Sequence, residues 1–456
     1  MSVKIDPTFS LSNWVVGNYV CNWTGIACDD KERVVSVVIK YKALSGRIPP
    51  HMGNISFLTT LDLSNNYLYG PIPQQVGKLK KLKYLKLHGN HLQGSIPPTL
   101  LACTNLLQLR LENNILSGSI PAELSSLHNL ERLMLGSNNL TGIIPQELAN
   151  SSALKTMHLG TNLLTGRIPS KLGALRDLRV LKLKRNWFSG EIAKSLGNCT
   201  RLRYLSLGEN MFEGPIPSEI FIALSRLEYL NLRVNKFVGT IPEDIGYNLP
   251  KLQEIYLDHN NLSGSLPKSL GNCSALYILQ TDDNKLSGAI PQELRMLTHL
   301  RSIILSENSF HGDVFPFLFN CTQLGNVELL LNRFEGSIPV DFGLRFTHLQ
   351  YFSAGANLFS GEIPKSLGNC SQLLLFDLGG NQLTGAVPQE LGMLTALEIL
   401  NLETNYFSSG SSAKTSVLNI LTNCSNLSDL DLSQNNFSGT LSGVLGNLPP
   451  PYLNCT

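Results

Sequence analysis

One short motif recurs along nearly the whole chain and constrains its fold more than any other feature. The motif is L-x-L-x-x-N-x-[LF], and its asparagine recurs in steps of 24 or 25 residues, with one final step of 30. These ladder asparagines are Asn66, Asn90, Asn114, Asn138, Asn162, Asn186, Asn210, Asn235, Asn260, Asn284, Asn308, Asn332, Asn357, Asn381, Asn405 and Asn435. A copy at residues 37–44 lacks the asparagine and brings the count to seventeen repeats. Such a period predicts a solenoid whose units pack only on their neighbours.

Each repeat divides into segments with different expected structures. The L-x-L segment predicts a short strand whose leucines point inward, and stacked strands would form one parallel sheet on a concave face. The amide of each ladder asparagine carries donors and an acceptor, so it can pair with backbone groups of the following turn. The remaining residues predict a helical or 3₁₀ turn on the convex side. The expected fold is therefore an α/β solenoid of about 17 repeats of 24 residues.

Two further patterns resemble plant leucine-rich-repeat receptors. After the asparagine comes [LF]-[ST]-G-x-[IL]-P, as in residues 116–121, which marks the plant-specific repeat subclass and implies a second short strand on one flank. Residues 1–32 resemble the N-terminal cap of these receptors, with Cys21 and Cys28 enclosing N-W-T-G-I-A. The lengthened repeat around residues 408–425 resembles the flagellin-receptor and elongation-factor-receptor group.

We expect three regions: a cap at 1–32, the solenoid at 33–441, and a truncated repeat or end segment at 442–456. The family's cap helix and signal peptide are not found in the cap region, so we interpret the cap as incomplete. The pattern decays after residue 445 without a paired-cysteine cap. We therefore expect a longer protein with a transmembrane helix and often a kinase, and apolar core exposed at 441–456 in this fragment.

Cysteines and glycosylation sequons indicate the secretory pathway. Cys21 and Cys28 lie close together before the first repeat and predict a disulfide. Six cysteines share one repeat position and predict buried thiols: Cys103, Cys199, Cys273, Cys321, Cys370 and Cys424. Cys455 has no identified partner. Thirteen N-x-[ST] sequons, none on an outward strand position, start at Asn22, Asn54, Asn139, Asn150, Asn198, Asn261, Asn272, Asn320, Asn369, Asn423, Asn426, Asn436 and Asn454.

Composition and motifs argue against several functions. The net charge of +2 gives no pull toward nucleic acid or anionic membrane. No apolar run is long enough to span a bilayer, so membrane attachment would need segments outside this sequence. Phosphate-loop, zinc-protease and nucleophile-elbow motifs are missing, and we predict no enzyme activity, cofactor or metal site. The acids at Asp258, Asp282, Asp283 and Glu307 are interpreted as solvated or ligand-facing.

The outward positions, six, four and two residues before each ladder asparagine, predict the binding surface. They are basic in the first half of the chain and then acidic, with tyrosines between, and we expect the ligand between residues 180 and 284. The candidate contacts are Lys182, Lys184, Arg185, Tyr204, Tyr229, Arg233, Tyr256, Asp258 and Asp282. Related receptors hold a peptide carboxylate with an R-x-R pair at these strand positions. The K-x-K pair of this chain resembles it but cannot form bidentate hydrogen bonds. The alternative is that these lysines belong to a solvated face. Beside it, Leu163, Trp187 and Met211 either cover the turn beneath or contact a partner.

The resemblance implies the ligand-recognition part of a plant cell-surface receptor. Such a protein would bind a peptide or protein ligand on the concave face and signal through a shorter leucine-rich-repeat co-receptor. The alternative is a secreted inhibitor of a microbial cell-wall-degrading enzyme, although such inhibitors have fewer repeats. Either reading places the chain on the outer face of the plasma membrane or in the extracellular space.

Overall fold

The computed structural model describes residues 3–7, 9, 11–409 and 417–438. Within it the chain forms two compact units, residues 1–236 and 237–456. Cys455, the Asn454 sequon and the expected apolar end at 441–456 lie outside the described residues, as does part of the lengthened repeat.

The L-x-L segments form short parallel strands, as predicted, and each pairs in register with the strand one repeat later. Leu133 faces Met157, for example, and Phe352 faces Phe376. In the first unit these strands are β3 (Val34–Val38), β5 (Thr60–Asp62), β7 (Tyr84–Lys86), β9 (Gln108–Arg110), β11 (Arg132–Met134), β13 (Thr156–His158), β15 (Val180–Lys182), β17 (Tyr204–Ser206) and β19 (Tyr229–Asn231). In the second they are β21 (Glu254–Tyr256), β23 (Ile278–Gln280), β25 (Ser302–Ile304), β27 (Asn326–Glu328), β29 (Tyr351–Ser353), β31 (Leu375–Asp377), β33 (Ile399–Asn401) and β35 (Asp429–Asp431). We call this the L-x-L sheet, and the side away from the core its open face.

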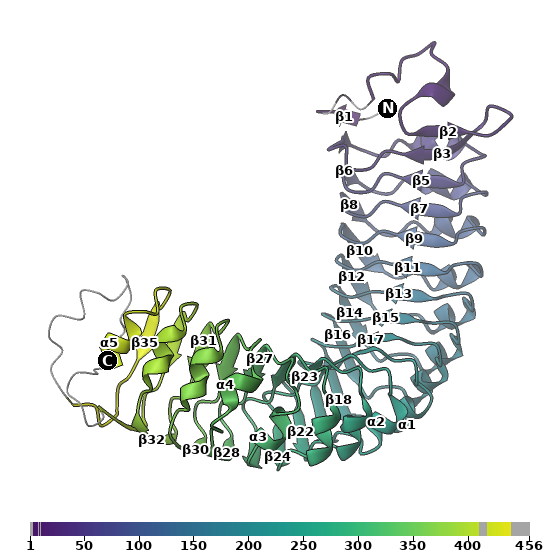
Figure 1. Cartoon of the computed structure of the whole chain (residues 1–456). Helices are drawn as coiled ribbons and strands as arrows, with labels where there is room; N and C mark the ends of the chain where they lie inside the picture. Colours follow the sequence, from purple (N-terminus) through teal and green to yellow (C-terminus); the bar gives the residue numbers. More distant parts are fainter. Residues whose placement is uncertain (1–2, 8, 10, 410–416, 439–456) are drawn as a thin grey trace. The chain divides into compact units, whose positions relative to one another are not determined.

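A second row of parallel strands, the flank strands, follows the ladder asparagines, as the plant-specific pattern implied (Figure 1). In the first unit they are β4 (Ser45–Gly46), β6 (Tyr67–Gly70), β8 (His91–Gly94), β10 (Ile115–Ser119), β12 (Asn139–Gly142), β14 (Leu163–Gly166), β16 (Trp187–Gly190) and β18 (Met211–Pro215). The row includes β20 (Lys236–Thr240) and, in the second unit, β22 (Asn261–Gly264), β24 (Lys285–Gly288), β26 (Ser309–Gly312), β28 (Arg333–Ser337), β30 (Leu358–Gly361), β32 (Gln382–Ala386) and β34 (Tyr406–Ser408).

Most repeats close with a 3₁₀ turn, as expected. These turns are η2 (Pro50–Asn54), η3 (Gln74–Lys78), η4 (Pro98–Ala102), η5 (Ala122–Ser126), η6 (Gln146–Asn150), η7 (Ser170–Ala174), η8 (Lys194–Asn198), η9 (Lys268–Asn272), η10 (Gln292–Met296), η11 (Lys365–Asn369) and η12 (Gln389–Met393). A short α-helix replaces the turn elsewhere: α1 (Glu219–Ile222), α2 (Ile245–Asn248), α3 (Phe315–Leu318), α4 (Phe342–Arg345) and α5 (Val417–Leu421). All but α3 lie in repeats longer than 24 residues, because an α-helix fits more residues into the same length.

The core is a stack of leucines and phenylalanines, one layer from each repeat. In the first unit Phe188 stacks on Phe212 with ring centroids 6.2 Å apart, and in the second Phe310 stacks on Phe334 at 6.1 Å. The six repeat-position cysteines are buried in this core with free thiols, as predicted. Burial raises the pKa of each thiol to about 11 or 12, so these cysteines are unreactive packing residues.

Each ladder asparagine completes the turn of the preceding repeat. In Asn162 the Oδ1 atom accepts the N–H of Leu140 at 3.0 Å, and Nδ2 donates to the carbonyls of Leu135 and Leu159 at 3.1 and 3.0 Å. The Asn235 amide accepts an N–H 23 residues earlier, from Phe212, and Asn435 accepts one 28 residues earlier, from Phe407. The same bond therefore forms whatever the length of the repeat, which confirms the predicted role of the amide.

The N-terminal cap joins the solenoid through antiparallel strands. β2 (Ile26–Cys28) pairs with β3, and β1 (Val3–Ile5) pairs with β4. The predicted disulfide between Cys21 and Cys28 is formed, next to η1 (Val20–Asn22). Across the described residues, none of the helices has the length and apolar character needed to span a bilayer.

Candidate ligand-binding site

An aromatic stack lies on the open face of the first unit. Tyr204 and Tyr229 begin the neighbouring strands β17 and β19 and are paired in register. Because adjacent strands lie about 4.8 Å apart, their rings can meet face to face. The ring centroids are 3.9 Å apart with an angle of 5° between the planes, and Nζ of Lys182 lies 4.5 Å from the centroid of the Tyr204 ring. Three of the predicted contact residues thus form one continuous, half-buried cation–aromatic group.

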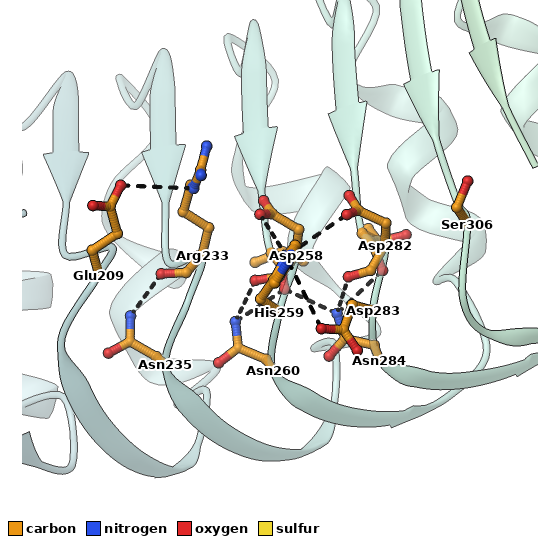
Figure 2. Close-up of polar contacts among 12 residues, drawn as sticks. Glu209, Arg233, Asn235, Asp258, His259, Asn260, Asp282, Asp283, Asn284 and Ser306 are labelled. Atoms are coloured by element: carbon orange, nitrogen blue, oxygen red, sulfur yellow. Dashed lines mark hydrogen bonds and ion pairs between the residues drawn. The ribbon is translucent and has the colours of Figure 1, made fainter. Parts of the chain in front are cut away.

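The basic residues beside this stack share one carboxylate, that of Glu209. Nζ of Lys184 lies 2.9 Å from its Oε1, and the Arg185 guanidinium donates to its Oε2. Nε of Arg233 lies 4.0 Å from Oε1 (Figure 2). Burial alone would raise the pKa of Glu209, but the hydrogen bonds from Arg185 and Lys184 lower it below its ordinary value. The predicted positive cluster is therefore partly neutralised.

Glu209 was missed because it lies one residue before a ladder asparagine rather than on the outward row. The residue at this position adopts a left-handed backbone in many repeats, with φ of 59° at Arg185 and 55° at Glu209. Such a turn directs the side chain away from the preceding strand and toward the neighbouring repeat. The sequence held a usable signal, because Arg185 and Glu209 occupy this position in successive repeats with opposite charges.

In the second unit, three of the four predicted acids, Asp258, Asp282 and Asp283, lie around one imidazole (Figure 2). Nδ1 of His259 is 3.2 Å from Oδ2 of Asp258 and 3.7 Å from Oδ2 of Asp282. Its Nε2 is 3.8 Å from Oδ2 of Asp283. Burial and the nearby Asp258 carboxylate raise the pKa of Asp282. On the same sheet, the hydroxyl of Tyr256 donates to Glu254 at 2.7 Å.

The position of Asp258 differs from the expectation that it faces outward. Its side chain is 1% exposed, so a ligand on the surface would not reach it in this conformation. The reason is that the L-x-L strands end four residues before the ladder asparagine. The residue two positions before it is also buried at Ser64, Glu112 and Ser306. The third position of the outward row is therefore buried in some repeats, whereas Lys184 and Arg233 at the same position are 36% and 35% exposed.

An apolar stripe runs along the flank of the first unit. Leu163, Trp187 and Met211 are the first residues of β14, β16 and β18, and they are 46%, 57% and 37% exposed. Side chains of this exposure can cover the turn beneath or contact a partner, and Tyr67, Ile115, Leu358 and Tyr406 are similarly exposed at the same repeat position.

The glycosylation sequons lie away from the open face. In the part of the chain that the structure describes, the asparagines of twelve sequons are exposed, and none of the twelve lies on an L-x-L strand. Glycans at these positions would leave the open face accessible.

Replacing Asp377 with asparagine is expected to remove a pH-dependent loss of stability. Asp377 accepts hydrogen bonds from the Ser353 hydroxyl at 3.1 Å and the Gly379 N–H at 3.0 Å, yet burial raises its pKa. A raised acid pKa favours the folded state at low pH, and this contribution is lost as pH rises through the folded pKa. Urea denaturation should be measured from about pH 3 to pH 7. As the pH increases, the free energy of unfolding of wild type should fall relative to that of Asp377→Asn. A constant difference between the two proteins would contradict this assignment.

Comparisons with known proteins place the chain among leucine-rich-repeat proteins. A family model described as a leucine-rich repeat region matches residues 161–373, and a leucine rich repeat model matches 57–79, 81–103, 129–151 and 426–448. Among curated proteins, the chain is 40% identical over 65 residues to the receptor kinase-like protein Xa21 of Oryza sativa subsp. japonica. That match covers 13% of this chain and 6% of that protein. The chain thus spans only a small part of the length of the curated relatives it matches.

Two solved structures resemble most of the chain. The plant peptide hormone receptor RGFR1 in complex with RGF2 has a TM-score of 0.87 and 34% identity, covering 96% of this chain and 68% of that one. The Arabidopsis receptor kinase HAESA, in complex with the peptide hormone IDA and the co-receptor SERK1, has a TM-score of 0.69 and 32% identity. The HAESA match covers 99% of this chain and 90% of that one.

Proposed function

We propose that this chain, which belongs to the plant leucine-rich-repeat receptor ectodomains, recognises a peptide on the open face of its first unit. The observation that carries this proposal is the group formed by Lys182, Tyr204 and Tyr229. Stacked tyrosines offer a large contact area with little conformational entropy to lose, and their hydroxyls can bond a peptide backbone. This combination is typical of residues that dominate a binding interface.

The charges around the stack suit a peptide with acidic groups. Lys182 supplies a positive charge at one end, while Lys184, Arg185 and Arg233 surround the Glu209 carboxylate. A carboxylate of the ligand could take the place of the Glu209 carboxylate beside these cations. The electrostatic cost would be small, because one anion replaces another. Glu209 would then act as a placeholder that keeps the basic side chains ordered before the ligand arrives. Preordered side chains reduce the entropy cost of binding.

The apolar stripe of Leu163, Trp187 and Met211 lies on the flank strands of the same repeats. We assign it a supporting role, in which it contacts an apolar part of the ligand. The resemblance to HAESA with IDA and SERK1 supports a further step, in which bound peptide recruits a shorter leucine-rich-repeat co-receptor. The exposed sequons support an extracellular location.

Charge reversal at Lys182 is expected to weaken peptide binding by at least about tenfold, or about 1.4 kcal/mol, because it removes a cation from the aromatic stack. Peptides would first be selected on the wild-type ectodomain from a displayed random library. Their affinities for wild type and Lys182→Glu would then be measured by calorimetry. Lys184 is a poorer choice, since a glutamate there would repel Glu209 and disturb the site.

The matched control is Lys171→Glu, which makes the same change of charge in the 3₁₀ turn η7 of the preceding repeat. It should leave affinity unchanged. Equal affinity for wild type and Lys182→Glu would overturn the site, whereas failure to select any peptide would overturn peptide recognition itself. Tight binding to a microbial polygalacturonase in place of a peptide would instead identify the chain as an inhibitor.

A further inference from the structure

Three side chains in the second unit bring atoms of the kind that bind metal ions close together. Asp258 and His259 follow strand β21, and Asp282 follows the neighbouring strand β23. The register of these strands, with Tyr256 opposite Gln280, places Asp258 and Asp282 at equivalent points of successive repeats. One ligand atom from each of the three residues lies within 4.8 Å of the other two. In Figure 2, dashed lines mark the contacts of the His259 imidazole with these carboxylates.

Two of the three ligand-to-ligand distances are close to those around a single ion. A zinc ion binds nitrogen and oxygen ligands at about 2.0–2.2 Å, so two ligands in a tetrahedral site lie about 3.4 Å apart. Nδ1 of His259 is 3.2 Å from Oδ2 of Asp258 and 3.7 Å from Oδ2 of Asp282. Small rotations of the partly exposed His259 and Asp282 side chains toward the buried Asp258 carboxylate would bring all three atoms onto one metal.

The other nitrogen of the imidazole lies near a carboxylate, at a distance longer than a hydrogen bond. Nε2 of His259 lies 3.8 Å from Oδ2 of Asp283, whose side chain is 56% exposed. Metal-bound histidines commonly donate their second N–H to a carboxylate, which fixes the tautomer and the ring orientation. With Nε2 protonated toward Asp283, the lone pair of Nδ1 points to Asp258 and Asp282.

The surroundings also favour a cation. The side chain of Asp282 is 16% exposed, and its Oδ1 atom is buried without accepting a hydrogen bond. Two carboxylates close together in a partly buried site repel each other, and a divalent ion between them removes that cost. The His259 side chain is 51% exposed, which gives an ion a route from solvent.

We propose that Asp258, His259 and Asp282 bind a divalent transition-metal ion of the zinc class. Three protein ligands leave a fourth coordination position, which water or an external carboxylate can take. The sequence alone predicted no metal site, because its ligands come from two repeats and follow no short metal-binding spacing. The proposal concerns the ion itself and does not depend on peptide recognition.

Isothermal titration of zinc chloride into the chelator-treated, glycosylated ectodomain tests the proposal. We expect one zinc ion bound per chain, and a loss of affinity of at least about tenfold in His259→Ala. Asp282→Asn should have a similar effect, so the conclusion does not depend on one variant that might misfold. Asp283→Asn should weaken binding less, because Asp283 only orients the imidazole.

The matched control is His299→Ala, which removes an exposed histidine whose Nδ1 lies near the Ser274 carbonyl instead. It should bind zinc as wild type does. The proposal is overturned if wild type binds no zinc, or if His259→Ala and Asp282→Asn, both folded by circular dichroism, keep the wild-type affinity. Parallel titrations with manganese and calcium chloride test the class of metal, since imidazole ligation favours zinc over calcium.

Discussion

Replacing Asn162 with leucine should lower the free energy of unfolding by about 2–3 kcal/mol, because it leaves a buried N–H group without an acceptor. That group is the backbone N–H of Leu140, which donates to Oδ1 of Asn162. The carbonyls bonded to Nδ2 lose less, since Leu135 also accepts from Asn138 and Leu159 from Asn186. Urea denaturation measures the loss. Hydrogen exchange should locate it at the Leu140 amide, in the repeat before the substitution.

Two further variants separate this mechanism from a general effect of losing an amide. Asn162→Asp retains an acceptor for Leu140 but places a carboxylate oxygen near several carbonyls, so it should also destabilise the fold. Asn105→Leu removes an exposed amide that makes one bond, to the Lys80 carbonyl at 2.8 Å. This control should cost less than about 1 kcal/mol. Equal losses for Asn105→Leu and Asn162→Leu would show that the ladder position has no special role.

Replacing Gly343 with alanine is expected to destabilise the second unit by about 3 kcal/mol, a cost typical of severe overpacking. Gly343 lies in α4 and packs against η11 of the next repeat, where its N–H donates to the Ser366 hydroxyl at 3.1 Å. A Cβ atom at this position would lie 1.7 Å from the Ser366 carbonyl oxygen. Because the clash is with backbone, the two repeats would have to separate locally.

The matched control is Gly325→Ala in the same unit. A Cβ atom there would lie 3.6 Å from its nearest neighbour, the His348 carbonyl oxygen, which is an ordinary contact. This variant should keep its denaturation midpoint close to that of wild type, while Gly343→Ala shifts to lower urea. A shift of similar size in both variants would mean that the loss reflects alanine replacing glycine rather than the contact with Ser366.

The repeat architecture could be predicted from the sequence because it depends on periodic local interactions. A leucine at every second position specifies the strand, and an asparagine at a fixed distance specifies the turn. The buried thiols and the Cys21–Cys28 disulfide followed from the same repeat frame. These features are set by the position of a residue within its repeat.

The candidate site was harder to predict because it depends on contacts between repeats. The register of neighbouring strands brings Tyr204 onto Tyr229, and a rule of alternate residues anticipated that. The same rule placed Asp258 on the outward row, although the strand has already ended there and the side chain is buried. It also passed over Glu209, whose left-handed backbone sends the side chain out of the strand pattern. The charge pairing at the candidate site could therefore be established only from the side-chain positions in the structure.

The ladder hydrogen bond separates two kinds of evolutionary change in this chain. It spans 22 residues at Asn162, 23 at Asn235 and 28 at Asn435, yet joins the same two points of the turn each time. Insertions can therefore accumulate on the helical side of a repeat without moving the strands that carry the tyrosines and charges. Selection can alter the outer surface by adding residues and the recognition surface by exchanging them, with little interference between the two.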